Sequence, residues 1–299
     1  VVSFSSATEA IAAAVASASF NSETVCLPDF SFIATLRGAQ IGYRGNITVQ
    51  DVEPEDWSLS NDGDFDKLFL PVCVFGSSPL YLMEKFSKYR AVIDAAASLG
   101  SSPDLSNLSE AHAVCFSLHA TKIFGTGEGG IAVFGAADWA SQARDWAAFG
   151  RFGNTGPRPS GSNGKMSEIQ ATFHLSRIRN AIQELDEWSL ANSKAKAISN
   201  ELGLSLAPFS FEHPSPYWII RLPNKEIRRV LEEYLNSQGV QTRRWWDISL
   251  SKAAKGLEHP NSRELRETTL GLPMYRGIEE SQLAYVGEKI SEVLVSGNV

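Results

Sequence analysis

The sequence contains few cysteines, and no pair of them lies at a spacing typical of a metal site or a redox pair. Cys26, Cys73 and Cys115 each fall within a short apolar run. This pattern excludes a disulfide-stapled scaffold and gives no reason to expect a metal centre. It predicts small core residues in a reducing compartment, which indicates a cytoplasmic protein.

Long hydrophobic runs and an excess of basic residues are also missing. No run approaches transmembrane length, and the alanine-rich start lacks the basic stretch of a signal peptide. The formal net charge of the 299 residues is −7, which argues against nucleic acid or an anionic membrane as the main partner. With 43% hydrophobic and 20% charged residues, the composition is that of a globular protein with an ample core.

Short apolar runs alternate with helix-like segments along the first half of the chain. Strands are expected at 24–27, 46–50, 67–75, 90–94, 113–116 and 131–134, and helices at 8–19, 32–43, 79–89 and 138–149. This alternation predicts an α/β fold with a mostly parallel central sheet that helices cover on both faces.

The remainder of the chain is expected to form a second, smaller unit. After a loop rich in glycine, proline and serine at 150–164, the pattern predicts the following: one long helix over 167–202, strands at 217–222 and 240–244, and helices at 224–238 and 279–295. We therefore expect a large ligand-binding domain over residues 1–180 and a small C-terminal α+β domain over residues 181–299.

Two ionisable residues, Asp94 and Lys122, follow neighbouring buried strands. A lysine between two buried strands is costly unless it has a partner or forms a Schiff base with a carbonyl group. A carboxylate at a strand end lies where ligands bind in open α/β sheets, and it can keep a pyridine nitrogen protonated. Pyridoxal 5′-phosphate (PLP) needs both groups, since its charged ring is the electron sink. The simpler alternative for Asp94 is the N-cap of the segment that follows it.

Four motifs together resemble those of the DegT/DnrJ/EryC1/StrS family of PLP-dependent aminotransferases, which act mostly on keto sugar nucleotides. They are PDFSFIAT (28–35), VIDAAASLG (92–100), SLHATKIFGTGEGG (117–130) and GSNGKMSEIQA (161–171), with a weaker similarity at LGLPMYRGI (270–278). The resemblance covers nearly the whole chain. It implies the PLP-dependent transferase fold type I, similar to aspartate aminotransferase.

The resemblance also implies a reaction and two catalytic residues. Lys122 would form the Schiff base with PLP and move the proton, and Asp94 would hold the ring nitrogen protonated. An amino acid, glutamate on the family's pattern, would donate its amino group to a keto sugar nucleotide. The segments around Lys122 and Asn163 resemble the subgroup that acts on dTDP-linked keto-6-deoxyhexoses.

Further site residues follow from the same resemblance. Ala7, Thr8 and Ser117 match positions that hold the cofactor phosphate, and Phe32 matches the aromatic residue that stacks on the ring. Asn163 matches a residue that relatives send across a homodimer interface to the partner's phosphate.

Candidate substrate contacts are less sharply defined. His119 would face the cofactor or the substrate, or else be a structural histidine. The segment Arg243-Arg244-Trp245-Trp246 is a dense basic and aromatic cluster that could clamp a diphosphate and stack a base. The alternative is a pair of core tryptophans beside solvated arginines.

The chain departs from the family pattern at two site positions. Ala7 stands where relatives carry glycine, and Ala97 stands where they carry glutamine or histidine in contact with the cofactor's 3′-oxygen. The family's first helix is normally preceded by a further segment, and its counterpart here begins at Ser6. Two alternatives therefore stay open: an aminotransferase for a cyclitol or aminobenzoate precursor, and a catalytically degenerate regulatory or scaffold member of the family.

Overall fold

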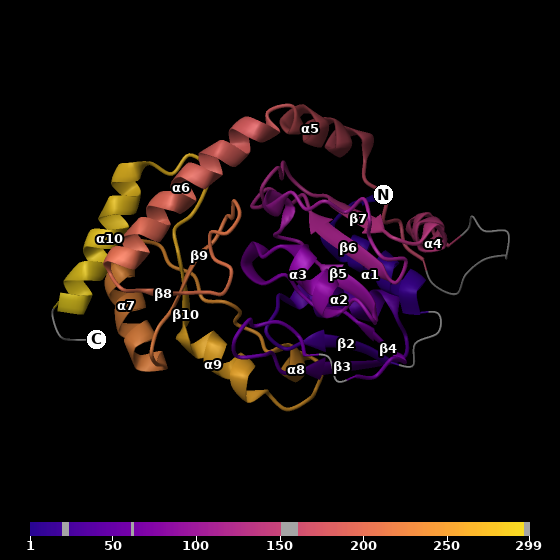
Figure 1. Ribbon diagram of the computed structural model, residues 1–299, viewed down its shortest axis with the longest axis horizontal. Helices are drawn as coiled ribbons and strands as arrows, with labels where there is room; N and C mark the ends of the chain where they lie inside the picture. The colour runs from indigo at the N-terminus through magenta and orange to yellow at the C-terminus, as the bar shows by residue number, and fades with distance from the viewer. Residues whose placement is uncertain (20–23, 61–62, 151–160, 296–299) are drawn as a thin grey trace.

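The computed structural model describes residues 1–19, 24–60, 63–150 and 161–295. Within these ranges a seven-stranded sheet occupies one side of the molecule, and a three-stranded sheet with its helices occupies the other (Figure 1). The helix α5 bridges the two sides at the top of this view. No described helix is long and apolar enough to cross a membrane.

The seven-stranded sheet has the order β1-β7-β6-β5-β4-β2-β3. Its strands are β1 (Val2–Phe4), β2 (Thr24–Pro28), β3 (Asn46–Gln50), β4 (Lys67–Phe69), β5 (Arg90–Asp94), β6 (His112–Ser117) and β7 (Gly130–Phe134). The strands from β3 to β6 pair in parallel, whereas β7 pairs antiparallel with both β6 and β1. The predicted mostly parallel α/β sheet is thus confirmed.

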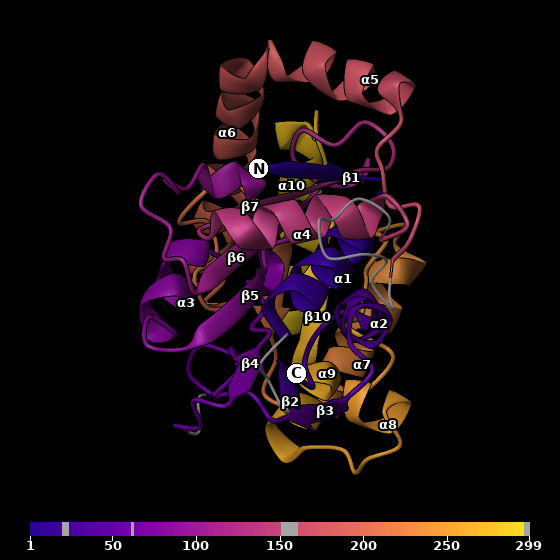
Figure 2. The same cartoon turned by 90° about the vertical axis from the view of Figure 1, so that its right-hand side faces the viewer.

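Helices alternate with these strands as expected. They are α1 (Ala7–Ala18), α2 (Ile33–Gly42), α3 (Pro79–Lys85) and α4 (Ala137–Ala147), with short 3₁₀ turns η2 (Val74–Gly76) and η3 (Leu99–Ser101). Helix α1 lies between α2 and α4 on one face of the sheet (Figure 2). Most of its alanines are completely buried, so it is fixed against the sheet with its N-terminus at the sheet edge.

The C-terminal part is built around a small antiparallel sheet of β8 (Ser205–Leu206), β9 (Trp218–Arg221) and β10 (Thr269–Leu272), in the order β10-β9-β8. The helices α5 (Glu168–Ile178), α6 (Ala181–Glu201), α7 (Lys225–Ser237), α8 (Leu250–Ala253), α9 (Pro260–Thr268) and α10 (Glu280–Val295) complete the fold. A separate hydrophobic core joins α6, α7, α10, β9 and β10. Leu250 of α8, however, packs into the core of the N-terminal part, so the division at residue 180 stays a prediction.

Three expected elements were wrong in extent. The strand predicted over 67–75 ends at Phe69, because Pro71 has no N–H for the ladder and Phe75 adopts a left-handed conformation (φ 51°). The strand predicted over 240–244 does not form. Within this segment only Arg243 makes a bridge, to Gly271 on the side of β10 that β9 does not occupy.

The long helix predicted over 167–202 is two helices, α5 and α6, that meet at Arg179 and Asn180. Arg177 and Glu184 would lie about 10 Å apart along the axis of a straight helix. At the break their side chains meet at 2.8 Å, with the Glu184 carboxylate almost fully buried. The buried ion pair therefore stabilises the junction between the two helices.

Serine hydroxyls cap two of these helices, and the cysteines lie in the core. Ser6 caps α1 and Ser167 caps α5, through bonds from the Glu9 and Gln170 amides. All three cysteines are buried as predicted. The loop predicted over 150–164 includes residues 151–160, which lie outside the described residues.

Candidate active site

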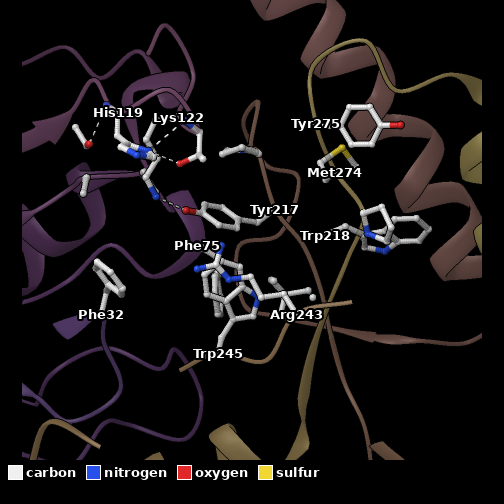
Figure 3. A pocket seen from close by; sticks show the side chains of 18 of the residues that line it. Phe32, Phe75, His119, Lys122, Tyr217, Trp218, Arg243, Trp245, Met274 and Tyr275 are labelled. Carbon is white, nitrogen blue, oxygen red and sulfur yellow. Dashed lines mark hydrogen bonds between the residues drawn. The ribbon is translucent and has the colours of Figure 1, made fainter. Parts of the chain in front are cut away.

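A large cavity of about 1460 Å³ lies between the N-terminal and C-terminal parts of the chain. The N-terminal wall comes from the carboxyl ends of the parallel strands, the loop after β6 and the first turn of α1. The C-terminal wall comes from the segments before β9, after α7 and after β10. Figure 3 shows Lys122 and Phe32 on one wall, facing Tyr217 and Trp245 on the other.

Lys122 projects into this cavity from the tight loop between β6 and β7. The loop closes through bonds from the Lys122 amide to the His119 carbonyl (2.8 Å) and from the Gly125 amide to the Lys122 carbonyl (2.9 Å). A side chain at Gly125 would meet the His119 carbonyl oxygen at 1.8 Å, so this turn requires glycine. The amine of Lys122 donates a hydrogen bond to the hydroxyl of Tyr217.

Asp94 ends β5 at the floor of the cavity and is 5% exposed. One carboxylate oxygen accepts from the Thr35 hydroxyl at 2.7 Å, and the other accepts from the Ala96 amide at 3.1 Å. Burial raises the pKa of the Asp94 carboxyl, while these two bonds and the charge of Lys122 act in the opposite direction. A buried carboxylate of this kind is suited to a cationic partner inside the cavity.

The N-terminus of α1 opens into the same cavity through Ser6, Ala7 and Thr8. The first-turn amides of a helix have no acceptor within the helix, and they attract anions together with the helix dipole. Ser117, at the end of β6, also lines the cavity, and its hydroxyl accepts from the His119 amide at 3.1 Å. These groups form one anion-binding corner.

Phe32 and His119 occupy the more open part of the N-terminal wall. Phe32 lies just before α2 and is 51% exposed within this single chain, with its ring at the cavity. His119 bonds through Nδ1 to the Thr121 hydroxyl (2.8 Å) and lies 3.6 Å from the Glu128 carboxylate through Nε2. His119 therefore lines the cavity, and its contacts with Thr121 and Glu128 stabilise the loop between β6 and β7.

The predicted basic and aromatic cluster divides between the cavity and the outer surface. Arg243 and Trp245 line the cavity, and the Arg243 guanidinium lies 4.2 Å from the centre of the Trp245 ring. Arg244 is not among the cavity residues; it pairs with Glu232 on α7 at 3.3 Å and is about half exposed. Trp246 also lines the cavity, stacked on Phe75 with ring centres 5.3 Å apart.

Asn163 does not reach the cavity of its own chain. It is exposed, and its side-chain oxygen accepts from the Lys165 amine at 2.6 Å. The backbone amide of neighbouring Gly164 bonds to the Ala147 carbonyl at the end of α4, which fixes this segment beside the N-terminal part.

The sequence reasoning missed several residues of the site. Tyr217 comes from the C-terminal part and contacts Lys122 over a separation of 95 residues, so no local pattern signals it. Thr35 closes the motif PDFSFIAT, and this position could have suggested its contact with Asp94.

The junction of α5 and α6 holds the loop that carries Lys122. Glu184 accepts from the Phe124 amide at 3.0 Å and from Arg177 at 2.8 Å, and Arg177 donates to the Gly125 carbonyl. Phe124 is in a left-handed conformation (φ 63°). The hydrogen bonds from Arg177 lower the pKa of the Glu184 carboxyl despite its burial. The pair therefore fixes the backbone two and three residues after the lysine.

Among the residues that the structure describes, no group of three or more histidine, cysteine, aspartate or glutamate side chains could hold a metal ion. The cavity instead combines an amine, a buried carboxylate and an anion-binding helix end. This combination suits a ligand that carries a carbonyl group, a cationic ring and a phosphate.

Comparison with known proteins agrees with this geometry. The family model of the DegT/DnrJ/EryC1/StrS aminotransferases matches residues 1–291. The chain belongs to this family. The resemblance stated from the motifs is thereby confirmed.

A dTDP-4-amino-4,6-dideoxy-D-glucose transaminase from Shigella dysenteriae is 26% identical over 228 residues. The match covers 68% of this chain, and the chain spans 59% of that relative's length.

Solved structures show the same fold at lower identity. NtdA from Bacillus subtilis, with the cofactor PMP bound, superposes with a TM-score of 0.81 at 21% identity, covering 98% of this chain and 73% of NtdA. DesI, determined in the presence of its TDP-sugar product, superposes with a TM-score of 0.81 at 22% identity, covering 99% of this chain and 81% of DesI. The chain thus has the fold of the PLP-dependent aminotransferases.

Proposed function

We propose that the protein is a PLP-dependent aminotransferase that moves an amino group from an amino acid to a keto sugar nucleotide. The observation that carries the proposal is the convergence of Lys122, Asp94 and the N-terminus of α1 on one cavity. The Shigella relative is a dTDP-sugar transaminase, and DesI was determined in the presence of its TDP-sugar product. These two similarities favour a dTDP-linked keto-6-deoxyhexose as the acceptor. Glutamate is the expected donor, and the cytoplasm is the expected location.

The residues present fit PLP in three separate places. The buried Asp94 carboxylate fits a protonated ring nitrogen. The α1 amides at Ala7 and Thr8, with Ser117, fit the phosphate. The Lys122 amine in the open part of the cavity fits the carbonyl carbon. When bound, PLP supplies an electrophilic carbon for amines and a charged ring that takes up the electrons of the Cα–H bond.

The chain's own residues then have defined roles. Lys122 would bond to the cofactor's carbonyl carbon, and its free amine would move the proton of the donor's α-carbon. Asp94 would hold the proton on the ring nitrogen by charge pairing. Phe32, whose ring lies at the cavity, would contact the cofactor ring. The Arg243 guanidinium lies over the Trp245 ring, and its described contacts include no ion pair. It can therefore bind the anionic groups of the substrate. His119 lines the same cavity.

A homodimer completes the proposal, with Asn163 acting in the partner's site. Helix α5, which begins five residues after Asn163, exposes Ile169, Phe173, Leu175 and Ile178 by 48–73%. So many exposed apolar side chains on one eleven-residue helix are typical of a protein interface. A second copy of the chain is the occupant that would also place Asn163 near a cofactor.

The reaction is tested by incubating the protein with PLP, glutamate and a panel of keto compounds, and by measuring 2-oxoglutarate and the aminated product. The panel contains dTDP-linked 4-keto and 3-keto 6-deoxyhexoses and keto cyclitols. We expect product with a dTDP-keto sugar, full activity in Lys88→Ala at an exposed position after α3, and none in Lys122→Ala. Product from a cyclitol alone would favour the alternative substrate class, and no product from any acceptor or donor would favour a scaffold role.

A further inference from the structure

The cavity contains one hydrogen bond that joins the two parts of the chain at the reacting group itself. The Lys122 amine, from the loop after β6, donates to the hydroxyl of Tyr217, from the segment before β9 (Figure 3). The amine also lies 5.1 Å from the centre of the Tyr217 ring. Tyr217 is thus the side chain from the opposite wall that contacts the lysine.

Tyr217 is held firmly in this place. Its ring packs between Phe75 (5.7 Å between ring centres) and Trp245 (5.3 Å). Its amide donates to the Ser215 hydroxyl at 3.3 Å, and that hydroxyl donates to the Phe75 carbonyl at 3.0 Å. Ser215 is in turn bonded twice to Asn192 of α6, at 2.7 and 3.0 Å. The Tyr217 hydroxyl is therefore held in a defined position, where it can accept a hydrogen bond from the flexible Lys122 side chain.

We propose that Tyr217 is a catalytic residue that receives the Lys122 amine whenever this amine is not bonded to the cofactor. The inference rests on the proposed transaminase function. A lysine amine sits on a flexible four-carbon stem, so a released amine without a partner would sample much of the cavity. The Tyr217 oxygen confines it beside the reacting carbons, which is the condition for rapid proton transfer.

The proton balance of this role is simple. The neutral Lys122 amine would take the proton from the donor's α-carbon and become an ammonium group, and the bound cofactor would take up the electron pair of the C–H bond. The ammonium would then release this proton to the cofactor and become neutral again. Tyr217 keeps its own proton throughout, because both forms of the lysine have an N–H to donate and the phenol oxygen accepts from either.

The first test uses the full-length protein without cofactor, so that it does not depend on catalysis. Wild type and Tyr217→Phe are treated with acetic anhydride, and the labelling rate of each lysine is followed by mass spectrometry. Loss of one hydrogen bond should free the amine and raise the labelling rate of Lys122 by about fivefold. Lys85, which bonds to Asp56 and Ser58 outside the cavity, should be unaffected.

The matched control is Tyr234→Phe, which removes a phenol hydroxyl that bonds to Glu292 far from the cavity. It should leave the labelling of Lys122 unchanged. Because Tyr217→Phe keeps the ring against Phe75 and Trp245, the variant should fold like the wild type. An unchanged Lys122 labelling rate in Tyr217→Phe would overturn the proposal.

The second test measures the reaction with glutamate and PLP. Tyr217→Phe should lower kcat by about tenfold to a hundredfold with the glutamate KM within about twofold, because the hydroxyl acts on proton transfer and not on donor binding. The rate ratio between ordinary and α-deuterated glutamate should increase. An active wild type with an equally active Tyr217→Phe would overturn the catalytic role alone, whereas an inactive wild type would contradict the proposed function itself.

Discussion

Asp94, the residue we propose as the partner of the cofactor ring, is a buried acid whose ionisation should destabilise the protein when no cofactor is bound. Its carboxylate is buried, and only the Thr35 hydroxyl and the Ala96 amide are within hydrogen-bond distance in the described contacts. Because burial raises its pKa, the folded protein holds the proton of this carboxyl more tightly than an exposed aspartate would. A bound pyridinium would act in the opposite direction, since its positive charge favours the carboxylate.

This leads to a prediction about stability and pH. Since the folded-state pKa of Asp94 is raised, its contribution to stability is fully present below the ordinary value near 4 and is lost as pH rises through the folded value. An asparagine side chain at this position would not ionise. The cofactor-free Asp94→Asn variant should therefore gain stability relative to wild type as the pH is raised above about 4.

Thermal denaturation of both proteins across that range measures the effect. If the difference in melting temperature between the two proteins does not change with pH, ionisation of Asp94 does not destabilise the folded protein and the prediction is wrong. The same variant loaded with PLP should lose the half-reaction with glutamate by about a hundredfold or more, since it cannot charge-pair the ring nitrogen.

The residues to which we assign the chemistry were easier to predict than the residues that hold them in place. Lys122 and Asp94 were singled out because they follow neighbouring buried strands, and Ser117 was singled out by the family resemblance of the motif that contains it. Tyr217 and Glu184 reach the same loop from separations of 95 and 60 residues, which no local pattern encodes. Arg243 and Arg244 are neighbours in sequence, but Arg243 lines the cavity and Arg244 pairs with Glu232 on the surface, a division that the sequence pattern does not indicate.

At the scale of elements, the break between α5 and α6 affects the site because its residues contact the loop of Lys122. A helical pattern runs through the break, because both halves have apolar residues at helical spacing. At the junction, Arg177 and Glu184 form a buried pair that periodicity does not signal. Hydrophobic periodicity therefore predicted both helices and missed the turn between them.

Removing Glu184 should weaken both the fold and the loop of Lys122. Glu184→Ala leaves the Phe124 amide and the Arg177 guanidinium without their buried acceptor, which we expect to cost about 3 kcal/mol of unfolding free energy. Urea denaturation measures this cost. Glu187→Ala on the same helix removes a half-exposed partner of Arg276 and should cost less than about 1 kcal/mol. Equal losses in the two variants would contradict the role assigned to the buried pair.

At the scale of the molecule, the site is assembled from segments that lie far apart in the chain. Lys122 and Asp94 belong to the seven-stranded sheet and its loops, and Tyr217 and Arg243 belong to the C-terminal part. Asp29 joins the two parts, since it is completely buried and accepts from Ser249 and the Ser251 amide at 2.9 and 2.8 Å. Strand and helix alternation predicted the mostly parallel sheet, whereas this docking could not be predicted because it depends on side chains 220 or more residues apart.

The proposed homodimer is tested by complementation between two inactive variants. If Asn163 acts in the partner's site, a mixed dimer of Lys122→Ala and Asn163→Ala contains one site with both residues intact. Random mixing should then restore about a quarter of the wild-type activity, since half of the dimers are mixed and each has one working site. Phe173→Asp on the exposed face of α5 should abolish this recovery, and Leu257→Asp, which is 89% exposed elsewhere, should not. A mixture that stays inactive would show that Asn163 does not act across an interface.

The most direct test of the account is the visible absorption spectrum of the purified protein with added PLP. Wild type should develop a yellow band that bleaches when glutamate is added, as the amino group passes to the cofactor. Lys122→Ala should develop neither the band of the lysine adduct nor its glutamate-dependent loss on the same timescale, while Lys88→Ala should behave like wild type. A wild-type protein that forms no such band would contradict the assignment of Lys122 and Asp94 to a PLP site.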